Sequence, residues 1–506
     1  MLGDQGTFTW QQPTADAPPL LLSSEGAGCA TCPPTGLNFS YDDQGRLLEA
    51  AKNSLGNAAG QDSRTYRYDE QGRLAEIRRV DVGGNDELVE RREYVDNSAL
   101  SPVRIFRKSV NPNGERVVEI ERDDRGLPVR MTERGWSPLG NDLADTDTNG
   151  FEAIERVVEL SYDDGRLVSI DGPRTDVEDI TGFVWDDQQR LQRIDKPDSP
   201  QLHLIDVDIL GRVTQFRLGA QSPVNMEYAG SGHTVASITQ LGRTIGFSYD
   251  AESRLSAFTS PDGQIRRIVY NDAGLIGELI DDNGQRTVIS YDSEGRRTDT
   301  QEFGLDGVMI RSVSQLFDSL GRLSVTDTAT LNATGTPNGR QLNRKYDEAG
   351  RLASVTDAAS GDQLVVEHNA FGRLASITEP ATLTVDAQGN ETDTLRTGFE
   401  YDSAGNEVAL IDGRNNRTLY LKDDFGRVVT LNSPESGITR YRYDAADNRI
   451  GKRQADGTET SYTWDAANRM TGKVRPDGEY RYAYSSVDGK LIESVAPETI
   501  ERFGVF

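Results

Sequence analysis

The chain has 506 residues, of which 35% are hydrophobic, and its formal net charge is −27 at pH 7. So acidic a surface repels phosphate backbones, which argues against nucleic-acid binding by the chain as a whole. We interpret the charge as a source of solubility, ahead of the alternative that an acidic face attracts a basic partner. No apolar run approaches the roughly 18 residues of a membrane helix. The 2 cysteines exclude a disulfide scaffold.

The first segment, residues 1–37, shows no repeat and is rich in Pro, Gly, Ala and Ser, so we expect an N-terminal cap or leader. No basic leader precedes its short apolar run, which argues against a secretory signal peptide. Cys29 and Cys32 form a CxxC pair. A thioredoxin-like role needs a βαβ context and a zinc site needs two more ligands, so we favour two free thiols or a local disulfide.

One unit repeats from residue 38 to residue 496. Its first copies read YDDQGRL from Tyr41 and YDEQGRL from Tyr68. Between Trp185 and Tyr291 the copies follow at steps of 22, 21, 21, 21 and 21 residues, and such a register is not a product of chance. The last residues, 497–506, are expected to be a C-terminal tail.

Each copy predicts a β-hairpin. Aromatic and β-branched residues precede the repeat aromatic, the following Asp caps a turn, and a Gly three residues later supplies a positive φ. Leu352 and Val355 do not keep strict period two, which indicates a bulge or a twist. The Arg after the turn Gly is expected to pair with carboxylates of neighbouring units. The positions expected to set the register are Tyr41, Asp42, Gly45, Tyr68, Asp69, Gly72, Tyr346, Asp347, Gly350, Tyr443, Asp444, Trp464 and Asp465.

The repeat predicts an all-β fold of tandem hairpins. A single hairpin cannot bury its apolar face, so successive units must pair edge to edge. A sheet of over about thirty strands must wind into a spiral or shell, or break into propeller blades, and the period of about 21 residues argues against blades. We therefore predict a long spiralling sheet that forms a partial or complete hollow shell.

The YDxxGRL copies resemble the YD repeats of the RHS (rearrangement hotspot) family, over nearly the whole chain. Related arrays occur in bacterial polymorphic toxins, in C subunits of Tc toxins and in teneurins. The resemblance implies a sheet that spirals into a cocoon, which in toxin members encloses a toxic domain released by self-cleavage. The core motif with its catalytic aspartates is not found before Phe506, so the resemblance carries over no catalytic residue.

Other candidate sites are weak. Asp145, Asp147 and Asn149 match the first half of a calcium loop, but Arg156 stands where a bidentate Glu is needed, so an acidic turn is favoured over a metal site. Three scattered histidines are poor material for a catalytic triad, and His368, which replaces the repeat aromatic, is assigned to packing. We expect no catalytic residue, no cofactor and no metal.

The sequence therefore predicts a non-enzymatic scaffold of an RHS-type toxin or cell-surface protein that encapsulates or presents a polypeptide. Its partners would be a polypeptide cargo or toxin domain, and secretion machinery or a cell-surface partner. We expect it in the cytoplasm before export and then secreted or at the cell surface by a non-classical route. The alternative is a module that binds carbohydrate or a cell surface, with Trp136, Trp185 and Trp464 as stacking platforms. An enzyme on a β-solenoid is the third hypothesis.

Overall fold

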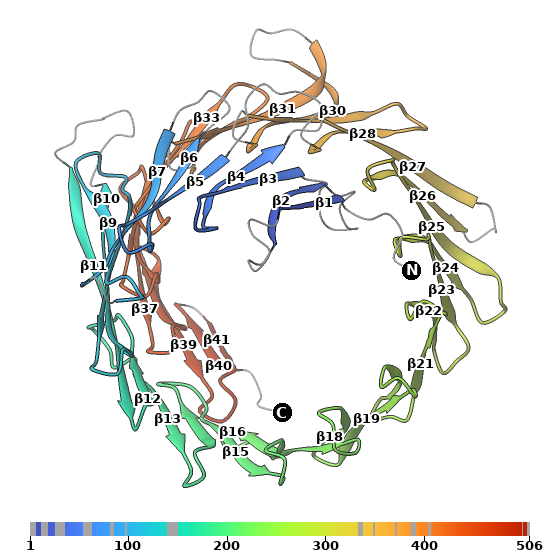
Figure 1. The fold of residues 1–506 in the computed structure, drawn as a ribbon, viewed down its shortest axis with the longest axis horizontal. Helices are drawn as coiled ribbons and strands as arrows, with labels where there is room; N and C mark the ends of the chain where they lie inside the picture. Colours follow the sequence, from blue (N-terminus) through green and yellow to red (C-terminus); the bar gives the residue numbers. More distant parts are fainter. Residues whose placement is uncertain are drawn as a thin grey trace. The chain divides into compact units, whose positions relative to one another are not determined.

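The computed structural model describes residues 7–11, 19–25, 36–53, 63–80, 86–96, 99–138, 150–331, 337–347, 350–369, 372–385, 391–402, 406–497 and 499–502. These residues form 41 β-strands and no helix (Figure 1). The strands belong to one sheet, and the strands that pair do so antiparallel, which confirms the all-β prediction. In the described part of the chain, no helix could span a membrane.

Contacts divide the chain into two units, each of which is described by itself. Unit 1 comprises Met1–Val89, Ile245–Phe399 and Ile411–Asn415; unit 2 comprises Glu90–Thr244, Glu400–Leu410 and Asn416–Phe506. Four strands cross the unit boundaries: β7 (Asp86–Glu93), β19 (Arg243–Tyr249), β31 (Glu391–Tyr401) and β32 (Glu407–Ile411).

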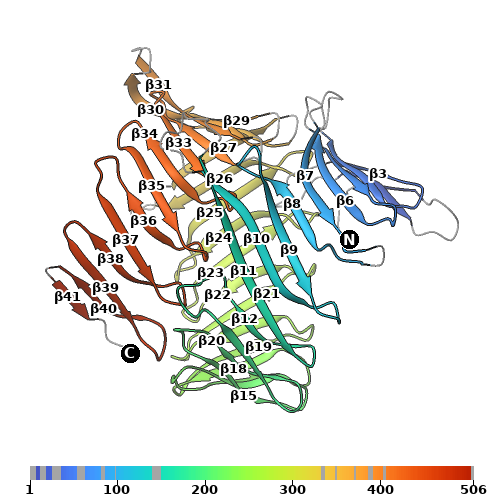
Figure 2. The ribbon, with the colours of Figure 1, turned by 90° about the vertical axis from the view of Figure 1, so that its left-hand side faces the viewer.

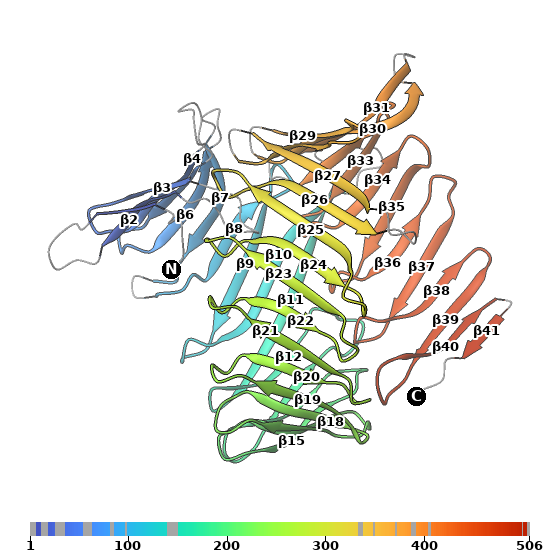
Figure 3. The same cartoon turned by 90° about the vertical axis from the view of Figure 1, so that its right-hand side faces the viewer.

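Unit 1 holds two runs of strands, and in the second run β20 to β27 follow one another side by side (Figure 3). Its strands are β1 (Thr7–Gln11), β2 (Leu20–Glu25), β3 (Gly36–Tyr41), β4 (Leu47–Asn53), β5 (Ser63–Tyr68), β6 (Leu74–Val80), β20 (Leu255–Thr259), β21 (Ile265–Tyr270), β22 (Ile276–Ile280), β23 (Arg286–Tyr291), β24 (Arg297–Phe303), β25 (Met309–Phe317), β26 (Leu323–Leu331), β27 (Pro337–Tyr346), β28 (Leu352–Asp357), β29 (Gln363–His368) and β30 (Leu374–Val385).

Unit 2 also holds two runs, which we call strip A (β8 to β18) and strip B (β33 to β41). Strip A contains β8 (Arg104–Lys108), β9 (Glu115–Arg122), β10 (Pro128–Pro138), β11 (Phe151–Asp163), β12 (Arg166–Asp171), β13 (Thr181–Trp185), β14 (Leu191–Asp195), β15 (Leu202–Val207), β16 (Val213–Leu218), β17 (Val224–Tyr228) and β18 (Val235–Gln240). Strip B contains β33 (Arg417–Lys422), β34 (Val428–Ser433), β35 (Gly437–Tyr443), β36 (Arg449–Arg453), β37 (Glu459–Trp464), β38 (Met470–Arg475), β39 (Gly478–Tyr484), β40 (Leu491–Ala496) and β41 (Thr499–Arg502).

The ends of the chain also contain strands. In the segment 1–37, β1 pairs with β2, and β2 pairs with β3, the strand that leads to the first repeat copy. In the segment 497–506, β41 pairs with β40. The sheet thus extends into both segments. Cys29 and Cys32 lie outside the described residues.

Many of the repeat hairpins carry a bulge at the repeat aromatic residue. In the pairing of β27 with β28, Lys345 lies opposite Ser354, but Tyr346 lies opposite Leu352. Ala353 is therefore the extra residue, and the same register shift recurs at Tyr41, Tyr68, Tyr443 and Trp464. This confirms the irregularity expected between Leu352 and Val355, because the bulge adds one residue on one strand only.

The hydrophobic core is thin. Among the described residues, the buried apolar side chains are small or β-branched: Ala51, Val118, Ala409 and Val429. Most apolar strand residues are half-buried on a face of the sheet, as expected from a chain that is 35% hydrophobic. Turn geometry and polar contacts must therefore contribute much of the specificity of this fold.

The turn glycines provide the first prediction. Gly350 has a φ of 77°, whereas Ser253, at the same position of another unit 1 turn, adopts a φ of 62° without being glycine. A left-handed conformation costs an L-residue about 1–2 kcal/mol. We expect Gly350→Val to destabilise unit 1 by at least about that amount and Ser253→Gly to stabilise it. Thermal unfolding of both variants measures this, and an unchanged Tm for Gly350→Val would contradict the turn assignment.

Candidate functional site

The repeat turn is built around its aspartate. Asp42 Oδ1 accepts hydrogen bonds from the backbone N–H groups of Gln44 (3.0 Å) and Arg46 (2.9 Å), and its Oδ2 accepts one from Arg46 Nε (2.6 Å). Asp69, Asp347 and Asp465 make the corresponding bonds in their own turns. In all of these turns, one carboxylate fixes both the backbone and the arginine.

The expectation for the repeat arginines was wrong for most of them. Arg46 and Arg322, for example, pair with the aspartate of their own turn and cover the aromatic ring of the next repeat. Arg427 makes both contacts and, as expected, also pairs with a carboxylate of the neighbouring unit, that of Asp447. Arg46 lies 4.7 Å from the centre of the Tyr68 ring, and Arg322 lies 4.6 Å from that of Tyr346. The reason is geometric: a planar guanidinium can bind a carboxylate at its edge and still stack its face on a ring.

The repeat aromatic joins each hairpin to the preceding one. The Tyr346 hydroxyl donates to the carbonyl oxygen of Leu323 at 2.8 Å, the Tyr443 hydroxyl donates to that of Val428 at 2.8 Å, and Trp464 Nε1 donates to that of Arg449 at 3.0 Å. Burial raises the pKa of the Tyr443 hydroxyl. These bonds were not predicted from the sequence, although the preference for Tyr and Trp at this position, both of which carry a donor, was a signal for them.

Two residues considered for other roles take part in repeat contacts. The Trp185 indole N–H donates to the carbonyl oxygen of Leu167 at 2.9 Å. His368 is half-buried, with Nδ1 3.9 Å from Asp347 Oδ2. Burial, followed by the nearby Arg351, lowers the pKa of His368, so the folded chain favours its neutral ring.

Acid should weaken the repeat turns. The side-chain hydrogen bond from Arg212 is the first cause that lowers the pKa of Asp208, and for Asp186 it is the backbone N–H of Arg190. Because the unfolded value is about 3.9, the unfolded chain takes up more protons than the folded chain as the pH falls. The stabilisation that the ionised aspartates give the folded chain is present above the unfolded-state pKa. It is lost as the pH falls through the lower pKa of the folded state.

We therefore expect the Tm to fall mainly below about pH 4. Asp208→Asn should lower the Tm at pH 7 and make its decline in acid shallower, because one linked proton is removed. Calorimetry between pH 3 and pH 7 measures both effects. An equally steep decline in the variant would contradict the assigned linkage.

The candidate functional site is the seam of unit 2, where turns of strip B contact loops of strip A (Figure 2). Its centre is Asp424, in the turn between β33 and β34. Asp424 Oδ2 accepts hydrogen bonds from Ser109 Oγ (2.7 Å) and the Trp136 N–H (2.8 Å), and Oδ1 accepts one from the Val110 N–H (2.6 Å). Asp424 is only 8% exposed, so its charge is satisfied almost entirely by strip A.

Backbone contacts complete this centre. The Asp424 N–H donates to the carbonyl oxygen of Trp136 at 2.9 Å, and Arg116 Nη1 donates to the Asp424 carbonyl oxygen at 2.9 Å. The close approach requires Gly135, because a Cβ there would lie 2.8 Å from Asp424 Cβ. The neighbouring Phe425 ring lies 3.9 Å from the guanidinium carbon of Arg156. Arg156, considered above as a failed calcium ligand, also pairs with a carboxylate of strip B, that of Asp447.

The next turns of strip B contact strip A through the side chain of Arg174, which is 6% exposed. Its Nη1 donates to the Asp465 carbonyl oxygen at 2.6 Å, its Nη2 donates to that of Trp464 at 3.3 Å, and its Nε lies 3.4 Å from Asp444 Oδ2. Further along, Asp198 Oδ2 accepts a hydrogen bond from the Ala466 N–H at 2.9 Å. Successive turns of one strip therefore contact successive loops of the other.

The structure thus brings together only some of the positions singled out in the sequence. Asp444, Trp464 and Asp465 meet at Arg174, and Tyr443 adjoins them. Three aromatics with their turn partners lie in unit 1, each at a separate turn: Tyr41, Asp42, Gly45, Tyr68, Asp69, Gly72, Tyr346, Asp347 and Gly350. Asp145, Asp147 and Asn149 lie outside the described residues. Within the described ranges, no three His, Cys, Asp or Glu side chains are grouped to hold a metal.

The family model of the RHS repeat matches residues 346–384, 423–459 and 450–480. These segments contain the turns of Asp347, Asp424 and Asp465 described above. The chain therefore contains RHS repeats. A comparison with curated proteins gives no match.

Several solved structures match this chain, the first of them with a clear likeness in fold. The crystal structure of TcdB2–TccC3 without its hypervariable C-terminal region matches with a TM-score of 0.60 and 12% sequence identity, over 96% of this chain and 27% of that chain. A further crystal structure of TcdB2–TccC3 matches with a TM-score of 0.38 and 11% identity, over 97% and 31%. A Tc holotoxin pore from Photorhabdus luminescens matches with a TM-score of 0.28 and 13% identity, over 94% and 32%. The chain therefore spans about a third or less of these three chains.

Proposed function

We propose that this RHS-repeat protein is a non-enzymatic wall segment of a toxin-type shell that holds a polypeptide. The observation that carries the proposal is the seam, in which Asp424 binds the Trp136 N–H across 288 residues of sequence. A sheet whose distant strips bind each other through buried contacts can form a continuous wall instead of a single ribbon. The RHS repeats and the fold likeness to TcdB2–TccC3 support the same proposal.

The chemistry of the repeat turns supports a structural role. Many repeat aspartates accept backbone and guanidinium hydrogen bonds inside their own turn, as at Asp42 and Asp465. Hydrogen bonds of this kind lower the pKa of Asp208 and Asp186. A general acid needs a pKa near the working pH, so these carboxylates are unsuited to that task.

The wall would act by excluding other proteins from the polypeptide that it holds. A polypeptide behind a continuous wall would be kept from proteases and from its targets until release. We propose that the partners are a polypeptide cargo or other toxin components, and that the protein is made in the cytoplasm and secreted by a route that needs no classical signal peptide.

Electron microscopy of the purified chain tests this proposal. We expect particles with a hollow interior bounded by a continuous wall. Flat or extended ribbons would contradict the wall, whatever their stability. Particles of the Asp424→Ala variant, compared on the same grids, should open along the seam.

A further inference from the structure

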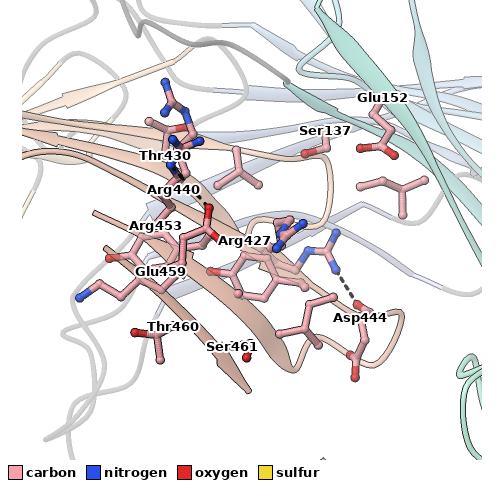
Figure 4. Close-up of a pocket in the computed structure, with 18 of the residues that line it drawn as sticks. Ser137, Glu152, Arg427, Thr430, Arg440, Asp444, Arg453, Glu459, Thr460 and Ser461 are labelled. Atoms are coloured by element: carbon pink, nitrogen blue, oxygen red, sulfur yellow. Dashed lines mark hydrogen bonds and ion pairs between the residues drawn. The ribbon is translucent and has the colours of Figure 1, made fainter. Parts of the chain in front are cut away.

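A groove of about 960 Å³ lies in unit 2 between the β10–β11 hairpin and strands β34 to β38 (Figure 4). Its size is at the upper end of ligand pockets, which run from about 300 to 1,000 Å³. Six cationic and four anionic side chains line it, whereas the chain as a whole has 55 Lys and Arg against 82 Asp and Glu. The charge balance of the groove is thus opposite to that of the protein.

Strand register explains where the cations lie. Arg440 lies opposite Arg453, so the two side chains share one face of the sheet. Arg442 lies two residues further along β35, on the same face of the sheet. It lies opposite Gly451, and Gly451 in turn lies opposite Ser461. These small neighbours leave room for the guanidinium: a Cβ on Gly451 would lie 3.0 Å from Arg442 Nε.

Most of the carboxylates lining the groove already have partners. Glu155 pairs with Arg134 at 2.7 Å, Glu459 with Arg453 at 3.6 Å, and Asp444 with Arg174 at 3.4 Å. Glu152 is the fourth carboxylate that lines the groove.

Two cationic side chains of the groove, those of Arg442 and Lys452, differ from these carboxylates because they have no ion-pair partner among the described residues. Arg442 is exposed, and neither it nor Lys452 forms an ion pair with any carboxylate of the described residues. Lys452 Nζ instead donates to Gln454 Oε1 at 3.3 Å. Arg442 therefore retains its donor fork for a ligand.

We propose that this groove binds an acidic polypeptide segment, with Arg442 taking a Glu or Asp carboxylate of that segment through two parallel hydrogen bonds. The hydroxyl groups of Thr430 and Ser461 line the same groove and supply further polar contacts. A short acidic segment would meet only the groove, whereas an extended nucleic acid would also meet the surface of a chain with net charge −27. The inference extends the proposed function by giving the held polypeptide a chemical character.

Fluorescence anisotropy with the full chain tests the proposal. The probe is a labelled heptapeptide of alternating Glu and Gly, and its counterpart carries Gln in place of Glu. We expect the Glu peptide to bind in a salt-sensitive manner and Arg442→Gln to weaken that binding about tenfold or more, because the variant loses two hydrogen bonds to a charged group. Arg442→Lys should restore part of it, since the charge returns without the fork.

Arg481→Gln is the matched control, because Arg481 is an exposed strand arginine of strip B that does not line the groove. It should bind the Glu peptide as the unaltered chain does. Equal binding of the Glu and Gln peptides, or unchanged binding by Arg442→Gln, would overturn the proposal. Equally tight binding of a single-stranded oligonucleotide would overturn the assignment to a polypeptide. None of these outcomes bears on the hollow particles expected from the proposed function.

Discussion

Replacing Asp424 with Ala is expected to lower the free energy of unfolding of unit 2 by about 3 kcal/mol, since a lost buried acceptor leaves its donors unsatisfied at about 1–3 kcal/mol each. The donors that lose their acceptor in this variant are the N–H groups of Val110 and Trp136 and the hydroxyl of Ser109. Urea unfolding followed by tryptophan fluorescence is a suitable measurement, because three of the 4 tryptophans lie in unit 2.

The control for this change is Asp187→Ala. Asp187 occupies the same position of the repeat turn as Asp424, in the copy WDDQQRL, but it is exposed. Its replacement should change stability by no more than about 0.5 kcal/mol. Equal effects of the two changes would show that the turn position matters and the seam does not.

Adding one methyl group at Gly135 is expected to cost about 1–3 kcal/mol, the usual range for overpacking a filled site. The new Cβ would lie 2.8 Å from Asp424 Cβ and 3.1 Å from the Phe425 ring, and neither atom is the end of a flexible side chain. The Gly135→Ala variant should therefore unfold at lower urea concentration than the unaltered chain.

Gly182 offers the matched comparison, as another mid-strand glycine of strip A. A Cβ there would meet nothing closer than 3.7 Å. Gly182→Ala should be neutral or stabilise the chain by up to about 1 kcal/mol, because alanine loses less conformational freedom on folding. Destabilisation of both variants alike would contradict a close approach of the two strips at Gly135.

The hairpins could be predicted from the sequence because their causes are local. The aromatic, the capping Asp and the turn Gly act within one repeat, so a spacing of about 21 residues was enough to place strands, turns and even the bulge near Leu352. The partner of the repeat Arg was predicted wrongly, because the sequence does not show that its own Asp, four residues earlier, lies within reach.

The seam could not be predicted, because its contacts join positions that the repeat does not distinguish. Asp424 stands in a DD pair, as do Asp43, Asp124 and Asp187, and only the fold sets it against Trp136. Arg174 belongs to a loop outside the repeat pattern. Contacts between distant turns produce no periodic pattern in the sequence, so only the structure reveals them.

Hydrogen exchange measured by mass spectrometry tests the seam most directly. In the folded chain, the N–H groups of Val110 and Trp136 donate to a carboxylate more than 280 residues away, at 2.6 and 2.8 Å. We predict slow exchange in peptides that contain these two residues and fast exchange in the same peptides of Asp424→Ala, with peptides of unit 1 unchanged. Equal exchange of the Val110 and Trp136 peptides in the two proteins would contradict a seam held by Asp424.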